Sequence, residues 1–296
     1  MTRGLGELAA VAELPSWLVA LAALVTQFGD VWFVFCLLGL LYWFGNALPG
    51  PLSLSRRHAM FAVALALVAR AVTTTFKELF ALPRPPGADE AVGVELVPAV
   101  VEPLYVSAAT ADGFGFPSGH ATAAILVYGG LALLVDSRRG YVAAGALVAA
   151  IPVSRVVLGV HYLVDIAAGL AFGGAFLAGV YLVCGRGDNP GRALMVAVGV
   201  SLLGAGVVYN FDTMAALGGA LGARIAWGSL GDAVVHETTT QLGGAVAVAV
   251  GLLFGAAFGA MYVVEPMPAV GFLGMAVVLA GVIAAPLVGE AVARRV

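Results

Sequence analysis

Three short clusters of polar residues interrupt this apolar chain, and their side chains could together bind and cleave a phosphate ester. Cationic groups hold phosphate oxygens, one imidazole can attack phosphorus, and a second can protonate the departing oxygen. The three clusters are Lys77 with Arg84-Pro85, Pro117-Ser118-Gly119-His120, and Ser154-Arg155 with His161 and Asp165.

The second cluster has the pattern of a helix start that binds an anion. Proline suits the first turn of a helix, so Pro117 can open one. Ser118 and Gly119 would then present a hydroxyl and unpaired backbone N–H groups at the positive end of the helix dipole. His120, the next residue, could act as a general acid toward a leaving group.

The other two clusters supply cations and a nucleophile. Arg84 and Arg155 can each grip two phosphate oxygens with a planar guanidinium, and Lys77, the only lysine in the chain, adds a point charge. His161 and Asp165 lie four residues apart at the start of an expected helix and share one face. The carboxylate can therefore fix the imidazole in one tautomer and make it a better nucleophile.

Each cluster alone also has a structural explanation. Lys77 and Arg84 could extend to the membrane interface, and Arg155 could anchor to lipid headgroups. The second cluster could be a plain helix start, and His161 with Asp165 could be a structural pair. All of these explanations would have to hold together at separate positions, so we favour a single site.

The composition predicts an all-α fold, a polytopic transmembrane helical bundle. The chain is 61% hydrophobic and 10% charged, whereas soluble domains carry about 25% charged residues, so a water-soluble core is excluded. The net charge of −3 gives no basic footprint, and nucleic acid is not an expected partner. No CxxC or HExxH spacing occurs, so we expect neither a protein-built metal site nor another cofactor.

Apolar runs of about 20 residues, the length of a membrane span, divide the chain into three regions. We expect an N-terminal interfacial segment over 1–27, a core with the three clusters over 28–189, and an additional C-terminal transmembrane region over 190–296. The topology of 210–296 stays open, because the run at 212–228 is short and contains Arg224. The candidate spans are 28–46, 58–77, 119–136, 140–158, 161–184, 191–209, 242–264 and 269–289.

Arginine bias predicts how the bundle is oriented. Arg56-Arg57, Arg138-Arg139 and Arg186 with Arg192 lie in alternate connections, which should be cytoplasmic. The long segment 85–116 contains acidic residues and no base, and it faces the other way. All three clusters then lie at helix ends on the non-cytoplasmic side, where the 85–116 segment could cover them as a lid.

Arg70 is a further candidate, with a supporting role. It lies seven residues before Lys77, on about the same helical face and inside the bilayer, where an arginine indicates function. We expect a structural ion pair between Arg70 and Asp30 rather than direct contact with phosphate.

In this order and spacing, the three clusters resemble the signature of the type 2 phosphatidic acid phosphatase and haloperoxidase superfamily. The resemblance covers roughly residues 28–185. It implies a helical-bundle core and metal-independent hydrolysis through a phosphohistidine on His161, with Asp165 orienting the ring and His120 protonating the leaving group. The groups that it implies for holding phosphoryl oxygens are those of Lys77, Arg84, Ser118, Gly119 and Arg155.

We therefore expect a lipid phosphate phosphatase of the cell membrane, with the bilayer and a phosphorylated lipid as its partners. The resemblance implies phosphatidic acid, phosphatidylglycerol phosphate or a polyprenyl diphosphate as the substrate class. Two alternatives remain: a phosphotransferase that uses the same site, and a non-enzymatic anion-binding protein or transporter. Charges at helix ends and the lack of an evident repeat argue against a transporter. The sequence leaves the oligomeric state open.

Overall fold

The computed structural model describes residues 3–47, 50 and 53–295, and every regular element in this part of the chain is helical. The predicted all-α fold is therefore confirmed. The helices, in chain order, are α1 (Glu7–Ala12), α2 (Ser16–Thr26), η1 (Gln27–Gly29), α3 (Val31–Phe44), η2 (Gly45–Ala47), α4 (Arg56–Phe80), η4 (Val94–Leu96), α5 (Glu102–Ala109), α6 (Gly119–Ala124), the π-helix η5 (Ile125–Gly129), α7 (Gly130–Val135), α8 (Arg138–Val157), α9 (Leu163–Val183), α10 (Pro190–Val207), α11 (Phe211–His236), α12 (Gln241–Val264) and α13 (Pro268–Ala293).

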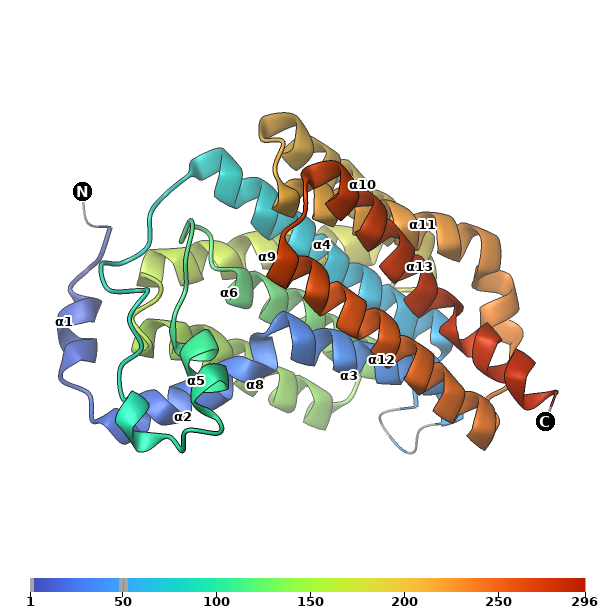
Figure 1. Ribbon diagram of the computed structural model, residues 1–296, viewed down its shortest axis with the longest axis horizontal. Coiled ribbons are helices and arrows are strands. Elements are labelled where there is room, and N and C mark those ends of the chain that lie inside the picture. The colour runs from blue at the N-terminus through green and yellow to red at the C-terminus, as the bar shows by residue number, and fades with distance from the viewer. Residues whose placement is uncertain (1–2, 48–49, 51–52, 296) are drawn as a thin grey trace.

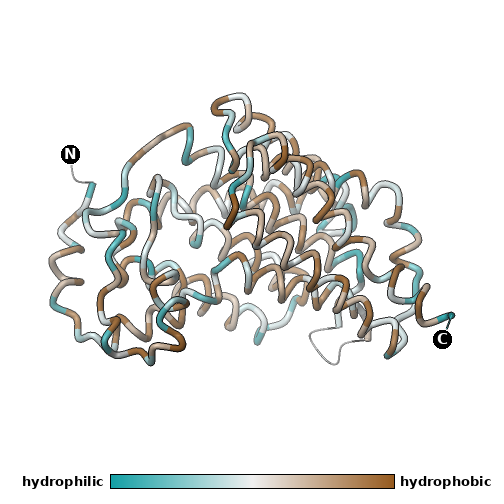
Figure 2. The backbone as a smooth tube through the Cα atoms, viewed as in Figure 1, coloured by the Kyte–Doolittle hydropathy of each residue, from teal (hydrophilic) through white to brown (hydrophobic). Residues whose placement is uncertain are grey.

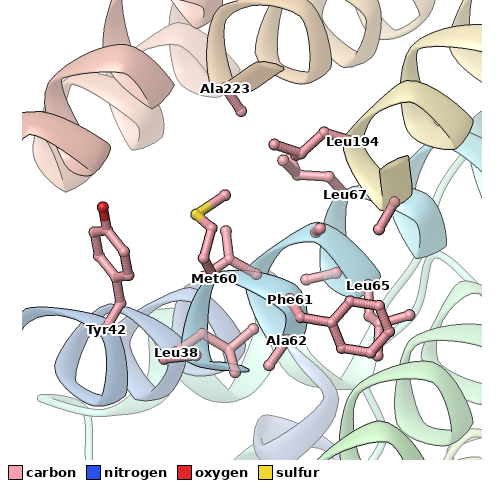
Figure 3. Packing of buried hydrophobic residues seen from close by; sticks show 14 of the residues in the cluster. Leu38, Tyr42, Met60, Phe61, Ala62, Leu65, Leu67, Leu194 and Ala223 are labelled. Carbon is pink, nitrogen blue, oxygen red and sulfur yellow. The ribbon is translucent and has the colours of Figure 1, made fainter. Parts of the chain in front are cut away.

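Helix α4 is the axis of the bundle (Figure 1). Its first turn is capped by Ser55, whose hydroxyl accepts the backbone N–H of His58 at 3.1 Å. Side chains on every face of α4 are buried, as is typical of a helix that other helices surround. Figure 3 shows part of this packing, in which Met60 and Leu67 of α4 lie among side chains of α3, α10 and α11.

The chain is a multi-pass membrane protein. Six of the described helices are long and apolar enough to cross a membrane: α4, α8, α9, α10, α12 and α13. Residues 16–29 and α3 add a seventh span if this pair, bent by 44°, is counted as one. Figure 2 shows hydrophobic residues along the length of these helices and hydrophilic ones mainly in the connections.

One predicted span has a different form. Residues 119–136 are a run of α6, η5 and α7, which ends at Asp136 with a left-handed φ of 43°. The run is too short to count among the six spanning helices. A π-helical turn of this kind often accompanies a functional site, and here it follows the helix start that carries His120.

The sequence left the topology of residues 210–296 open, and the structure shows that this region begins with the long helix α11. It has 26 residues, so the helix extends well beyond the run at 212–228. Near its start Asp212 pairs with Arg70, and near its end the carbonyl of Val234 accepts a hydrogen bond from Arg56. Arg56 and Arg70 are about 21 Å apart along α4 at 1.5 Å per residue, so α11 follows much of the length of the central helix.

Candidate active site

The structure brings most of the predicted site residues to one cavity of about 310 Å³. The two residues predicted to support the site, Asp30 and Arg70, also line this cavity, which we name the catalytic cavity. Ser118 and Asp165 are fully buried, and neither of them lines it. The predicted residues that line it are Lys77, Arg84, Gly119, His120, Arg155 and His161.

The imidazole of His161 is held between a carboxylate and a guanidinium. Its Nδ1 lies 3.4 Å from Oδ2 of Asp165, and its Nε2 lies 3.1 Å from Nη1 of Arg84. A guanidinium can only donate hydrogen bonds, so Nε2 accepts and carries no proton. The proton is therefore on Nδ1, toward Asp165, and the lone pair of Nε2 accepts from Arg84.

Burial and nearby cations keep this imidazole neutral. His161 lies in the connection between α8 and α9, outside the spanning helices, and only 2% of it is exposed. Desolvation, followed by the charges of Arg84, Arg155 and Lys77, lowers the pKa of His161 well below 6.5. At neutral pH the side chain is thus in the form that a nucleophile requires.

Asp165 has more partners than the sequence predicted. Its Oδ2 also accepts the backbone N–H of Tyr162 at 3.0 Å, and its Oδ1 pairs with Nη1 of Arg3 at 2.9 Å. Arg3 also donates to the carbonyl of Pro83, and its guanidinium lies 5.3 Å from the ring centre of Tyr162. Both carboxylate oxygens are therefore occupied, and the carboxylate cannot turn away from His161 without breaking two contacts.

His120 has a carboxylate partner of its own. Its Nε2 lies 2.8 Å from Oδ1 of Asp30, at the bend between η1 and α3. The chain passes very close to the ring there, because a Cβ placed on Gly29 would lie 2.8 Å from Cδ2 of His120. The site therefore contains two carboxylate–imidazole pairs, Asp165 with His161 and Asp30 with His120.

The predicted pairing of Arg70 with Asp30 is wrong. Arg70 pairs with Asp212 of α11, and its guanidinium lies 5.3 Å from the ring centre of Tyr262 in α12. The sequence could not reveal these partners, because they depend on how α11 and α12 return along α4. Arg70 nevertheless lines the catalytic cavity and ties the C-terminal helices to it.

The two arginines of the site are positioned by uncharged oxygen atoms. Arg84 donates to the carbonyls of Asp112 at 2.6 Å and Val160 at 3.1 Å. Arg155 is buried, and its Nη1 donates to Oγ1 of Thr26 at 3.0 Å and to the carbonyl of Ala108 at 2.8 Å. These contacts orient the guanidinium groups without neutralising their charge, so the cavity remains attractive to an anion.

Lys77 is a further basic side chain of the cavity. In the described part of the chain, no hydrogen bond or ion pair engages its ammonium, and the residue lines the cavity. Over the same residues, no group of three or more His, Cys, Asp or Glu side chains could hold a metal ion.

The start of α6 is fixed against α9. Ser118 caps α6 by accepting the N–H of Ala121 at 3.4 Å, and its own N–H donates to the carbonyl of Asp165 at 3.0 Å. A Cβ on Gly169 would lie 2.6 Å from the carbonyl oxygen of Ser118, so only glycine allows this approach. The hydroxyl of Ser118 is thus used by the helix, while Gly119 reaches the cavity.

Part of the 85–116 segment covers the cavity. Ser107, Thr110, Ala111 and Asp112 line it. The segment is attached to the site by the hydrogen bonds that Arg84 and Arg155 donate to its backbone carbonyls. Its role as a lid stays a prediction.

Comparison with known proteins identifies the family. The profile of the PAP2 superfamily matches residues 58–187, which contain all three clusters. Two curated relatives, the decaprenylphosphoryl-5-phosphoribose phosphatases of Mycobacterium tuberculosis strains CDC 1551 / Oshkosh and ATCC 25618 / H37Rv, are each 32% identical over 177 residues, which cover 57% of this chain and 85% of the relative. The chain belongs to the PAP2 superfamily. The predicted resemblance is confirmed, and this PAP2 protein is a phosphatase. No solved structure matches it significantly.

Proposed function

We propose that this protein hydrolyses the phosphate ester or diphosphate of a membrane lipid through a phosphohistidine on His161. The observation that carries the proposal is the contact of 3.1 Å between Nε2 of His161 and Nη1 of Arg84, in a cavity that Lys77 and Arg155 also line. Phosphoryl transfer depends mainly on positioning and on stabilising charge on the phosphoryl oxygens. Lys77, Arg84 and Arg155 supply that charge, and we propose a reaction that needs no metal ion.

The reaction has two steps. In the first, Nε2 of His161 attacks phosphorus, the bond from phosphorus to the lipid oxygen breaks, and His120 gives that oxygen a proton. In the second, His120 takes a proton from water, the water oxygen attacks phosphorus, and the bond from phosphorus to His161 breaks. Inorganic phosphate leaves, and both imidazoles return to their starting forms.

The two carboxylates have matching roles in this scheme. Asp165 holds the proton of His161 on Nδ1 and stabilises the positive charge that the ring acquires during attack. Burial and the charge of Arg155 lower the pKa of His120 to about 4, and Asp30 opposes this shift. The negative charge of a bound phosphate would add to the effect of Asp30 and favour the protonated form that a general acid needs. Gly119 at the start of α6 offers backbone N–H groups to the phosphoryl oxygens, and Ser118 fixes that helix start.

We propose a polyprenyl-linked phosphate as the substrate class. This choice is supported by the relatives, whose name specifies a decaprenylphosphoryl group on a phosphorylated ribose. The arginine-rich connections support a cytoplasmic location for the opposite end of the bundle, so we place the active site on the non-cytoplasmic face of the cell membrane. Residues 28–189 would form the catalytic core, with 1–27 as an interfacial segment and 190–296 as an added membrane region.

A panel of lipid phosphates tests the proposal. The purified protein is incubated with prenyl phosphates, phosphatidic acid and phosphatidylglycerol phosphate in the presence of a chelator, and phosphate release is measured. We expect release from the prenyl phosphates with wild type and none with His161→Asn. Complete loss of activity in the chelator would exclude the metal-independent mechanism, and transfer of phosphate to added alcohols in place of water would show a phosphotransferase.

A further inference from the structure

A second and larger cavity, of about 970 Å³, opens beside the catalytic one. It lies between α3 and the C-terminal helices α12 and α13, and we call it the lateral groove. Arg70, Lys77, Arg84 and Asp112 line both the catalytic cavity and the lateral groove. A molecule could therefore lie with one end in each.

The walls of the lateral groove are mainly apolar. From α3 it is lined by Trp32, Phe35 and Leu40, and from α12 by Leu252, Phe254 and Phe258, among others. Trp32 and Leu252 are more than half exposed. Helix α12 is long and apolar enough to cross a membrane, and α3 belongs to the bent pair that would be a seventh span. In a bilayer we expect the open side of the groove to face lipid.

The lateral groove has a polar end and a closed end. At the polar end Tyr262 of α12 lies against Arg70, beside the catalytic cavity. At the other end Trp43 of α3 packs on Gly251, where a Cβ would lie 2.0 Å from the indole, and its Nε1 donates to the carbonyl of Val282 at 3.2 Å. Residues 251 and 262 are about 16 Å apart along α12 at 1.5 Å per residue.

We propose that the lateral groove binds the hydrocarbon chain of the lipid whose phosphate enters the catalytic cavity, an inference that rests on the proposed function. Charge at one end, apolar walls and a direct connection to the catalytic cavity match a lipid with a phosphorylated head. The α12 and α13 walls lie beyond residues 58–187, the range that the family profile matches. The C-terminal helices thus provide part of the substrate site of this chain.

Two glycines of α12 allow the groove to be filled without disturbing the packing. Gly255 and Gly259 line the groove, and a Cβ on either would meet nothing within 4 Å. Gly255→Phe and Gly259→Phe should therefore fold and obstruct the groove. Gly199→Phe on α10 is the matched control, because its Cβ position is equally open and it does not line the groove.

The test compares kcat/KM for a water-soluble butyl phosphate with kcat/KM for long-chain prenyl and diacyl phosphates in mixed micelles. In the two groove variants we expect a loss of about tenfold or more for long chains, on the scale of a filled hydrophobic pocket. Butyl phosphate should be hydrolysed as by wild type, and Gly199→Phe should resemble wild type with all substrates. If only the prenyl or only the diacyl substrate is affected, the groove selects that chain.

Two other outcomes separate this inference from the proposed function. If wild type hydrolyses the long-chain lipids and both groove variants do so equally well, the groove does not bind the chain, while the phosphatase mechanism is unaffected. If wild type hydrolyses none of these phosphates, the proposed function itself is wrong and the groove assignment fails with it.

Discussion

Replacing Asp165 by asparagine tests how the nucleophile is held. One carboxylate oxygen accepts from Tyr162 and His161, and the other pairs with Arg3. An asparagine has one oxygen and one NH₂ group for these two positions. If the asparagine oxygen faces Tyr162 and His161, its NH₂ group faces Arg3, and two hydrogen-bond donors then oppose each other. In the opposite orientation it would donate to Nδ1 of His161, which moves the ring proton to Nε2 and blocks attack.

The expected loss follows from these contacts. A hydrogen bond to a charged group contributes about 1.5–3 kcal/mol, which is roughly a 10- to 150-fold change in rate at about 1.4 kcal/mol per factor of ten. Asp165 is fully buried, so solvent does not weaken the interaction. Inversion of the tautomer adds to this loss, and we expect kcat to fall by about 10²–10⁴ in Asp165→Asn.

Arg3 decides which orientation the asparagine takes, and this gives the experiment a second arm. Arg3→Gln removes the clash with the NH₂ group, so the double variant Arg3→Gln/Asp165→Asn should recover part of the lost kcat. The assay is steady-state phosphate release with saturating substrate, and circular dichroism checks the fold of each variant. A kcat for Asp165→Asn within about twofold of wild type would contradict the assigned tautomer.

Three further changes test other parts of the account. Asp30→Asn should lower kcat for alkyl phosphates by about 10–100-fold and leave p-nitrophenyl phosphate nearly unchanged, since that leaving group needs no proton; an equal fall for both would argue against His120 as the general acid. The pKa of His161 in the folded protein lies well below 6.5, so protonation of this ring should not lower kcat/KM between pH 7.5 and 6.5. Below about pH 6.5 the unfolded chain binds a proton at this ring that the folded protein does not bind. The free energy of unfolding should therefore decrease as the pH falls. Melting temperatures measured over a series of pH values should fall less for His161→Asn than for wild type. Gly169→Val should destabilise the protein by about 1–3 kcal/mol in thermal unfolding. Gly179→Val is the control on the same helix and should not destabilise it, because a Cβ at that position meets nothing within 4 Å. Similar melting temperatures for the two variants would show that the close contact between α6 and α9 does not contribute to stability.

The sequence predicted those parts of the site that depend on local geometry. The sequence predicted the contact of His161 with Asp165, but not its geometry: His161 lies in the connection before α9, so the contact is made at the helix start and not along one face of a helix. The alternation of spans brings Lys77 and His120 to the same end of the bundle, an inference that needs only the direction of each span.

The sequence did not predict contacts made across the fold. Arg3 reaches Asp165 from 162 residues away, and Asp30 pairs with His120 rather than Arg70. The first contact depends on where the N-terminal segment lies, and the second depends on the bend before α3. No residue pattern marks either feature, because several carboxylates are equally available to a buried arginine or histidine until the helices are packed.

The most direct test of the central claim is to trap the enzyme during turnover of a ³²P-labelled prenyl phosphate and to identify the labelled residue. The account predicts an acid-labile, base-stable phosphohistidine on the peptide that contains His161, formed by wild type within one turnover and absent from His161→Asn. Turnover without such a label, or a label on any other residue, would contradict it.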